Sequence, residues 1–129
     1  MKIFTGSESS YSTKVNFVDD NDVFVGYDTS QCCCEDADWY LVHDITPYSW
    51  DSNVGLDSDT LNLEPYTFNK EFFTELEGGS LDEGRMVVFK LEAESIPDLY
   101  LHIYNAHNGY YSHGLEVKHD GEIVKDIYL

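Results

Sequence analysis

Alternating apolar and polar residues predict that most of this chain forms β-strands. Every second residue is apolar from Thr13 to Val18 and again from Leu99 to Tyr104, and this period of two buries one face of a strand. Val23 to Tyr27 is a further strand-like run, separated from the first by Asp19-Asp20-Asn21-Asp22. Because Asp and Asn are typical turn residues, we expect an antiparallel hairpin at this point.

Two turn dipeptides divide the C-terminal third of the chain. Asn108-Gly109 precedes a strand-like run from Tyr111 to Lys118, and Asp120-Gly121 precedes another from Glu122 to Tyr128. Asp-Gly favours the type I′ turn, in which both central residues have a positive φ. Together with the run that begins at Leu99, these segments predict a meander of three successive antiparallel strands.

One segment has the spacing of a helix. Its apolar residues are Phe68, Phe72, Phe73 and Leu76, which would lie on one face of a two-turn helix that Gly78-Gly79 ends. We therefore expect an α+β fold, mostly antiparallel β in a sandwich or an open barrel, with one short helix.

Length and charge narrow the classes of function. The 129 residues, 42% of them hydrophobic, are enough for one packed domain, and since no linker is apparent we expect residues 1–129 to form a single domain. The chain carries 25 Asp and Glu against 7 Lys and Arg, a net charge of −18. Nucleic acids and anionic membranes bind cationic surfaces, so we expect neither as a direct partner. The absence of a long apolar run and the polar start predict a cytoplasmic protein.

The acidic residues are concentrated in one part of the sequence. Between Lys14 and Lys70 there are twelve Asp and Glu and no Lys or Arg. Unpaired charges stay at the surface, so we expect an acidic face that attracts a basic protein, for example by mimicking DNA, or that serves only to keep the chain dissolved. The residues predicted for this face are Asp19, Asp20, Asp22, Asp36 and Asp38.

Tyrosines and histidines gather near the predicted C-terminal hairpin. Tyr is enriched at binding interfaces, and imidazole is the commonest protein ligand for zinc. Sequence spacing fixes no metal ligands, and there is no G-x-S-x-G or phosphate-binding loop, so we assign no catalytic residue, no metal and no cofactor and favour a non-enzymatic function. The candidate binding residues are Tyr100, His102, Tyr104, His107, Tyr110, Tyr111 and His113.

The three cysteines are the neighbours Cys32-Cys33-Cys34. Such a cluster cannot form the spaced disulfide framework of small secreted domains, which suits a reducing compartment. A buried, small apolar role is the main interpretation, with metal binding or redox chemistry as alternatives.

Two short motifs resemble a known group of proteins. They are Gln31-Cys32-Cys33-Cys34-Glu35-Asp36 and the run from Asn105 to Gly114, which contains Asn108-Gly109-Tyr110-Tyr111-Ser112. They resemble small uncharacterised proteins of bacteria, phages and mobile elements that carry Q-x-C-C-E after a β-hairpin and N-G-Y-Y-S on a late hairpin, a domain of unknown function. This chain departs from that pattern by a third cysteine. The resemblance implies no activity, although it suggests a gene carried by a mobile element.

Three functions therefore compete. The leading one is an acidic interaction protein that binds a basic protein surface. The alternatives are a small-molecule or metal-dependent enzyme that uses the His-rich C-terminal hairpin, and a module that forms homo-oligomers without a ligand. Salt dependence separates the first from the other two, because exposed charges are screened.

Overall fold

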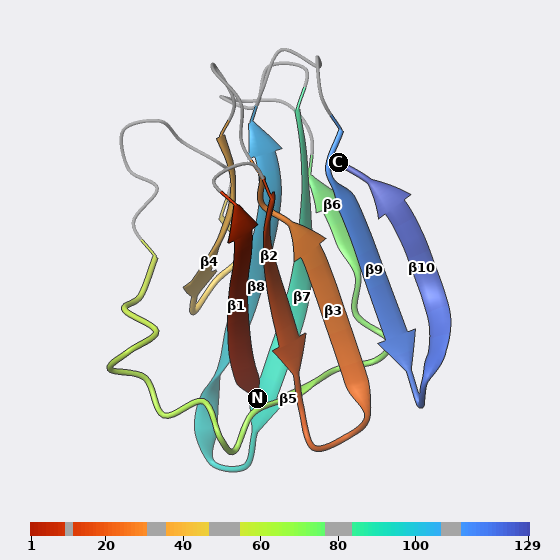
Figure 1. Ribbon diagram of the computed structural model, residues 1–129. Helices are drawn as coiled ribbons and strands as arrows, with labels where there is room; N and C mark the ends of the chain where they lie inside the picture. The colour runs from red at the N-terminus through yellow and green to blue at the C-terminus, as the bar shows by residue number, and fades with distance from the viewer. Residues whose placement is uncertain (10–11, 31–35, 47–54, 77–83, 107–111) are drawn as a thin grey trace.

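Two antiparallel sheets packed face to face make up the fold (Figure 1). The computed structural model describes residues 1–9, 12–30, 36–46, 55–76, 84–106 and 112–129. Sheet A contains, in spatial order, β1 (Lys2–Ser9), β2 (Ser12–Val18), β3 (Val23–Asp28), β9 (Gly114–His119) and β10 (Glu122–Tyr128). Sheet B contains, in spatial order, β4 (Asp36–Val42), β8 (Ile96–Ala106), β7 (Arg85–Ala93) and β5 (Thr67–Phe68), with β6 (Thr74–Leu76) also paired to β7.

The facing sides of the two sheets share one apolar core. Val15, Phe17 and Val25 of sheet A are buried against Leu41 and Leu101 of sheet B, all with at most 1% of their surface exposed. Val15, Phe17 and Leu101 belong to the alternating segments Thr13–Val18 and Leu99–Tyr104, which is why the sequence pattern located these strands. The sequence-predicted hairpin of β2 and β3 is confirmed by their antiparallel register.

The predicted helix is wrong, because in the described part of the chain residues 67–76 form the short strands β5 and β6 and no helix. Phe68 and Phe73 contact the ring of Phe89 at centroid distances of 5.9 and 5.5 Å. Phe72 instead contacts Tyr100, whose strand neighbours Leu99 and Leu101 point into the core. Apolar residues are thus needed on both faces of a sheet edge, and this produces a helix-like spacing without a helix. The fold is consequently all-β rather than α+β over the described residues.

The predicted C-terminal meander is also wrong. The strands β8 and β9 lie in different sheets, so the chain crosses from sheet B to sheet A between them. Alternation assigns a buried face to each strand but does not say which strand lies beside it. The last hairpin is confirmed, with β9 antiparallel to β10 and with Asp120 and Gly121 at φ values of 54° and 81°.

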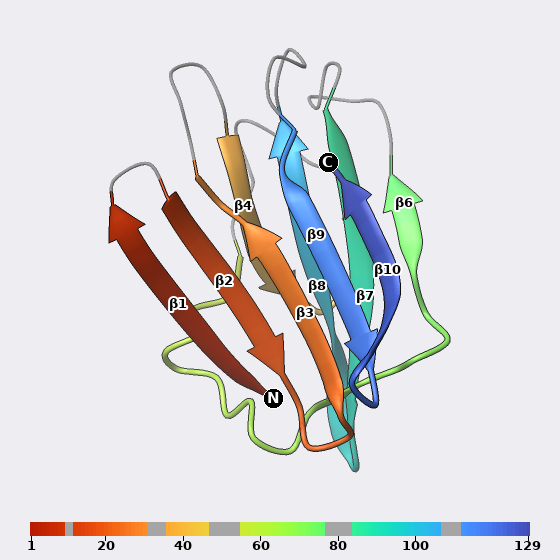
Figure 2. The same ribbon diagram turned by 45° about the vertical axis from the view of Figure 1, so that its right-hand side comes forward.

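The hairpin turns β2–β3, β7–β8 and β9–β10 all lie at one end of the sandwich, the lower end in both ribbon views (Figures 1 and 2). Residues 55–66, which precede β5, run past the same end. Among the described residues there is no helix long and apolar enough to cross a membrane.

Candidate functional site

The predicted binding residues are divided between the two sheets. Tyr100, His102 and Tyr104 alternate along β8 with core residues and so share the outer face of sheet B. His113 directly precedes β9 in sheet A. The predicted residues His107, Tyr110 and Tyr111 lie outside the described residues. The three cysteines Cys32, Cys33 and Cys34 lie outside them too.

His102 is fully buried on this outer face, because the chain that follows β4 covers it. Its Nε2 atom accepts a hydrogen bond of 3.1 Å from the backbone N–H of Thr46. A backbone N–H can only donate, so Nε2 carries no proton, and Nδ1–H donates to the carbonyl oxygen of Tyr100 at 3.1 Å. The imidazole also stacks on the ring of Tyr40, with centroids 4.5 Å apart. Burial lowers the pKa of His102 to about 4, against the hydrogen bond to Tyr100, which raises it.

The neighbours of His102 are held equally firmly. The hydroxyl of Tyr40 donates to the carbonyl oxygen of Thr46 at 3.1 Å, and burial raises the pKa of Tyr40. The hydroxyl of Tyr104 lies 3.4 Å from both carboxylate oxygens of Asp36. His102 therefore joins β8 to the segment above it, which is a structural role.

His113 points into the sandwich. It is 3% exposed, its Nδ1–H donates to the carbonyl oxygen of Asp28 at 2.9 Å, and its ring lies 6.1 Å from that of Tyr27. His102 thus lies on the outer face of sheet B, whereas His113 lies on the inner face of sheet A, so the two histidines do not share one hairpin. Within the described ranges, no group of three His, Cys, Asp or Glu is arranged to hold a metal ion.

The predicted acidic residues also separate. Asp19 is only 7% exposed, and its carboxylate accepts the backbone N–H groups of Asn21, Val23 and Phe68 at 3.0, 2.9 and 2.8 Å. It therefore organises the β2–β3 turn and ties it to β5.

Asp20 and Asp22 are exposed in the β2–β3 turn at the lower end of sheet A. Asp36 and Asp38 lie at the start of β4, opposite the end of β8 in sheet B. Desolvation raises the pKa of Asp38, as does the charge of Asp36, while the N–H of Trp39 lowers it. The five residues predicted for the acidic face are not brought together on one surface.

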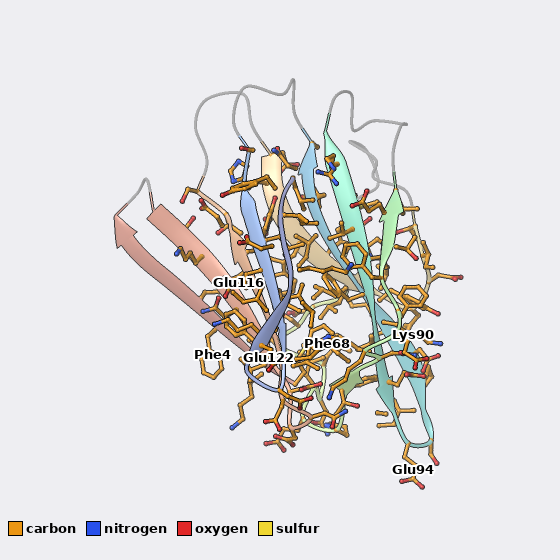
Figure 3. All side chains as sticks on the ribbon, turned by 90° about the vertical axis from the view of Figure 1, so that its right-hand side faces the viewer. Phe4, Phe68, Lys90, Glu94, Glu116 and Glu122 are labelled. Atoms are coloured by element: carbon orange, nitrogen blue, oxygen red, sulfur yellow. The ribbon has the colours of Figure 1, made fainter. Side chains whose placement is uncertain are left out.

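The fold instead gathers a different set of carboxylates at its lower end. All of them are exposed, and they come from the three hairpin turns and from the segments that flank β5. The backbone N–H of Asp120 donates to the carbonyl oxygen of Asp22 at 2.8 Å, which fixes the β2–β3 turn beside the β9–β10 turn. Figure 3 shows Glu94 projecting outward from the β7–β8 turn at this end. We call this set the acidic end: Asp20, Asp22, Glu64, Glu71, Glu94, Asp120 and Glu122.

Three of the seven Lys and Arg side chains pair with carboxylates outside this set. Arg85 pairs with Glu75 at 2.8 Å, Lys90 with Asp98 at 3.7 Å, and Lys118 with Glu116 at 3.2 Å. At the acidic end, the ammonium of Lys70 lies 3.5 Å from the carboxylate of Asp120. Lys2 and the N-terminal ammonium of Met1 lie beside Asp20 and Glu64. Seven carboxylates thus lie near three positive charges, and the acidic end keeps a net negative charge.

A groove of about 760 Å³ lies beside the acidic end. Its apolar lining includes Phe4, which is 53% exposed, together with Val18 and Pro65, and its charged lining includes Asp20, Glu64 and Lys2. The groove adds an apolar surface to a charged one, as protein-binding patches commonly do.

The sequence analysis included Asp20 and Asp22 of the β2–β3 turn in its acidic face, but it did not predict that the acids of the β7–β8 and β9–β10 turns lie at the same end. That arrangement depends on how the chain crosses between the two sheets.

Comparisons with protein-family models, with curated proteins and with solved structures found no match.

Proposed function

We propose that this protein is a non-enzymatic interaction protein whose acidic end binds a basic surface on another protein. The observation that carries the proposal is the location of seven exposed carboxylates in the turns and segments at one end of the sandwich, against three positive charges there, those of Lys2, Lys70 and the N-terminus. Concentrated charge of one sign speeds encounter with an oppositely charged partner and selects against like-charged ones.

The neighbouring groove supports a protein partner rather than a small cation. An exposed Phe4 beside Asp20 and Glu64 offers both an apolar contact and carboxylate acceptors. Arg and Lys have long apolar stems and charged heads, so they match this combination.

We further propose that the protein acts in the cytoplasm, which the cluster of three cysteines supports. We also propose that its gene is carried by a mobile element, which the Q-x-C-C-E and N-G-Y-Y-S motifs support.

An enzyme that uses the predicted His-rich hairpin has less support. His102 is buried and engaged by Thr46 and Tyr100, and His113 faces the core from the other sheet. A catalytic base needs access to a substrate proton, which neither geometry provides.

The test compares two triple variants of equal net charge. The first changes the acidic end by Asp20→Asn, Asp22→Asn and Glu122→Gln. The control changes Asp36, Asp38 and Asp126 to Asn, and all six side chains lie on strands or turns away from the core. Each immobilised protein is exposed to cell lysate at several salt concentrations, and captured proteins are quantified by mass spectrometry.

A specific partner at the acidic end is captured by the wild type and the control, is lost with the first variant, and dissociates as salt rises. If both variants capture the same proteins equally, binding responds only to total charge and the proposed site is wrong. If the wild type captures no basic protein at low salt, the interaction function itself is refuted.

A further inference from the structure

The four sheet edges of this sandwich differ in how they are protected. An unpaired edge exposes backbone N–H and C=O groups that can join another strand. At the edge of sheet B formed by β4, Leu56 donates its N–H to the carbonyl oxygen of Leu41 at 2.7 Å. The opposite edge consists of β5 and β6, which have two and three residues.

The edges of sheet A are also unequal. The strand β10 has a bulge between Ile123 and Lys125, and Arg85 donates to the carbonyl oxygen of Tyr128 at 2.6 Å. The strand β1 has eight residues, contains no proline and pairs with β2 alone. Figure 2 shows β1 at the open side of sheet A, with no described strand beyond it.

The hydrogen-bond pattern identifies which groups of β1 face outward. Asp19 bonds to Val23 and Thr29 bonds to Thr13, so the odd-numbered residues of β2 point their backbone groups towards β3. The even-numbered residues therefore bond to β1, where they pair with its even-numbered residues. It follows that Ile3, Thr5 and Ser7 direct their N–H and C=O groups to the free edge.

We propose that β1 pairs antiparallel with β1 of a second copy of this chain, with the twofold axis at Thr5, to form one continuous sheet. In this register Ile3, Thr5 and Ser7 make the interchain hydrogen bonds. Phe4 lies opposite Gly6 of the second copy in a non-hydrogen-bonded pair, where side chains approach most closely.

The residues of β1 are complementary to themselves in this register. Phe4 is 53% exposed, and a Cβ atom at Gly6 would meet no atom within 4 Å, so the space above Gly6 is open to receive an aromatic ring.

The orientation of the dimer also limits its electrostatic cost. Each copy has a net charge of −18. Because the two β1 strands run in opposite directions, the acidic end of one copy lies far from that of the other. The remaining repulsion is screened by salt, so dimerisation strengthens as salt rises, which is the opposite of binding to a basic partner.

Analytical ultracentrifugation of the purified protein, up to about 1 mM in high salt, tests the proposal. The wild type and Thr5→Val, which keeps the outward N–H, form dimers. Thr5→Pro removes the outward N–H without removing a bond to β2, so dimer affinity falls roughly 10- to 100-fold through the two lost symmetric bonds. Thermal unfolding checks that this variant remains folded.

A substitution of Phe4 provides a second test that does not rely on proline. Phe4→Ala removes the exposed ring that lies opposite Gly6 of the second copy, so it weakens the dimer. A wild type that stays monomeric throughout, a Thr5→Pro variant that dimerises as well as Thr5→Val, or a Phe4→Ala variant that dimerises as well as the wild type would each overturn the proposal.

Discussion

The buried imidazole of His102 makes stability depend on pH in a calculable way. In the folded protein its pKa is about 4, compared with 6.5 for an exposed histidine. Between these values the unfolded chain binds a proton that the folded protein does not, so stability is complete above pH 6.5 and is lost as the pH falls towards 4. The difference between the two pKa values, about 2.5, corresponds to about 3 kcal/mol of unfolding free energy.

His102→Phe isolates this contribution. Phenylalanine retains a ring to stack on Tyr40 but cannot accept the N–H of Thr46, so at neutral pH the variant is less stable by about 1–3 kcal/mol. Since phenylalanine does not titrate, this deficit shrinks by about 3 kcal/mol as the pH falls towards 4, and the variant there equals or exceeds the wild type.

Urea unfolding of both proteins at a series of pH values measures the difference directly, because the other titrating groups contribute to both. Ring resonances of His102 in NMR spectra give the protonation step independently. A difference in unfolding free energy that stays constant from neutral pH to pH 4 would refute the argument that burial keeps this imidazole neutral.

Three further substitutions test single elements of the fold. Gly121→Val places a β-branched residue at a φ of 81°, where no atom lies within 4 Å of its Cβ, so the expected loss of about 1–3 kcal/mol is backbone strain alone and a thermal unfolding change within error would contradict it. Asp19→Ala leaves three N–H groups, including that of Phe68, without their acceptor and costs about 3 kcal/mol in urea unfolding, whereas a loss below about 1 kcal/mol would show that water replaces the carboxylate. Gly55→Ala brings a Cβ to 2.8 Å from that of Tyr40, so it destabilises by about 1–3 kcal/mol and displaces the chain above His102, which an NMR titration reports as a higher pKa of His102.

The sequence was sufficient where the determining interactions are local. The β2–β3 and β9–β10 hairpins depend on residues within a few positions of each turn, such as Asp120-Gly121 with its positive φ values. The helix prediction failed because Phe72 and Phe73 serve different faces of sheet B, and one period cannot describe two faces. The meander failed because alternation does not encode which strand lies alongside which.

The candidate sites show the same limit. His102 is recognisable as a residue on a β-strand, but its role depends on Tyr40 and Thr46, which are 62 and 56 positions away in the sequence. The acidic end likewise requires the β2–β3 and β9–β10 turns to be adjacent, as the hydrogen bond between Asp120 and Asp22 records. Neither arrangement can be recognised from residues that are close together in the sequence.

Turn chemistry alone explains some of the acids at the acidic end but not all. Asp22 and Asp120 have φ values of 59° and 54°, a conformation that Asp tolerates. Asn tolerates it equally well, so the turns require a short polar side chain and not a charge. Glu94 and Glu122 belong to a residue type that turns do not favour, yet they occupy the β7–β8 turn and the start of β10. The charge at this end therefore exceeds what folding requires, and amide variants can remove it while preserving the turns, which makes binding and folding separable by experiment.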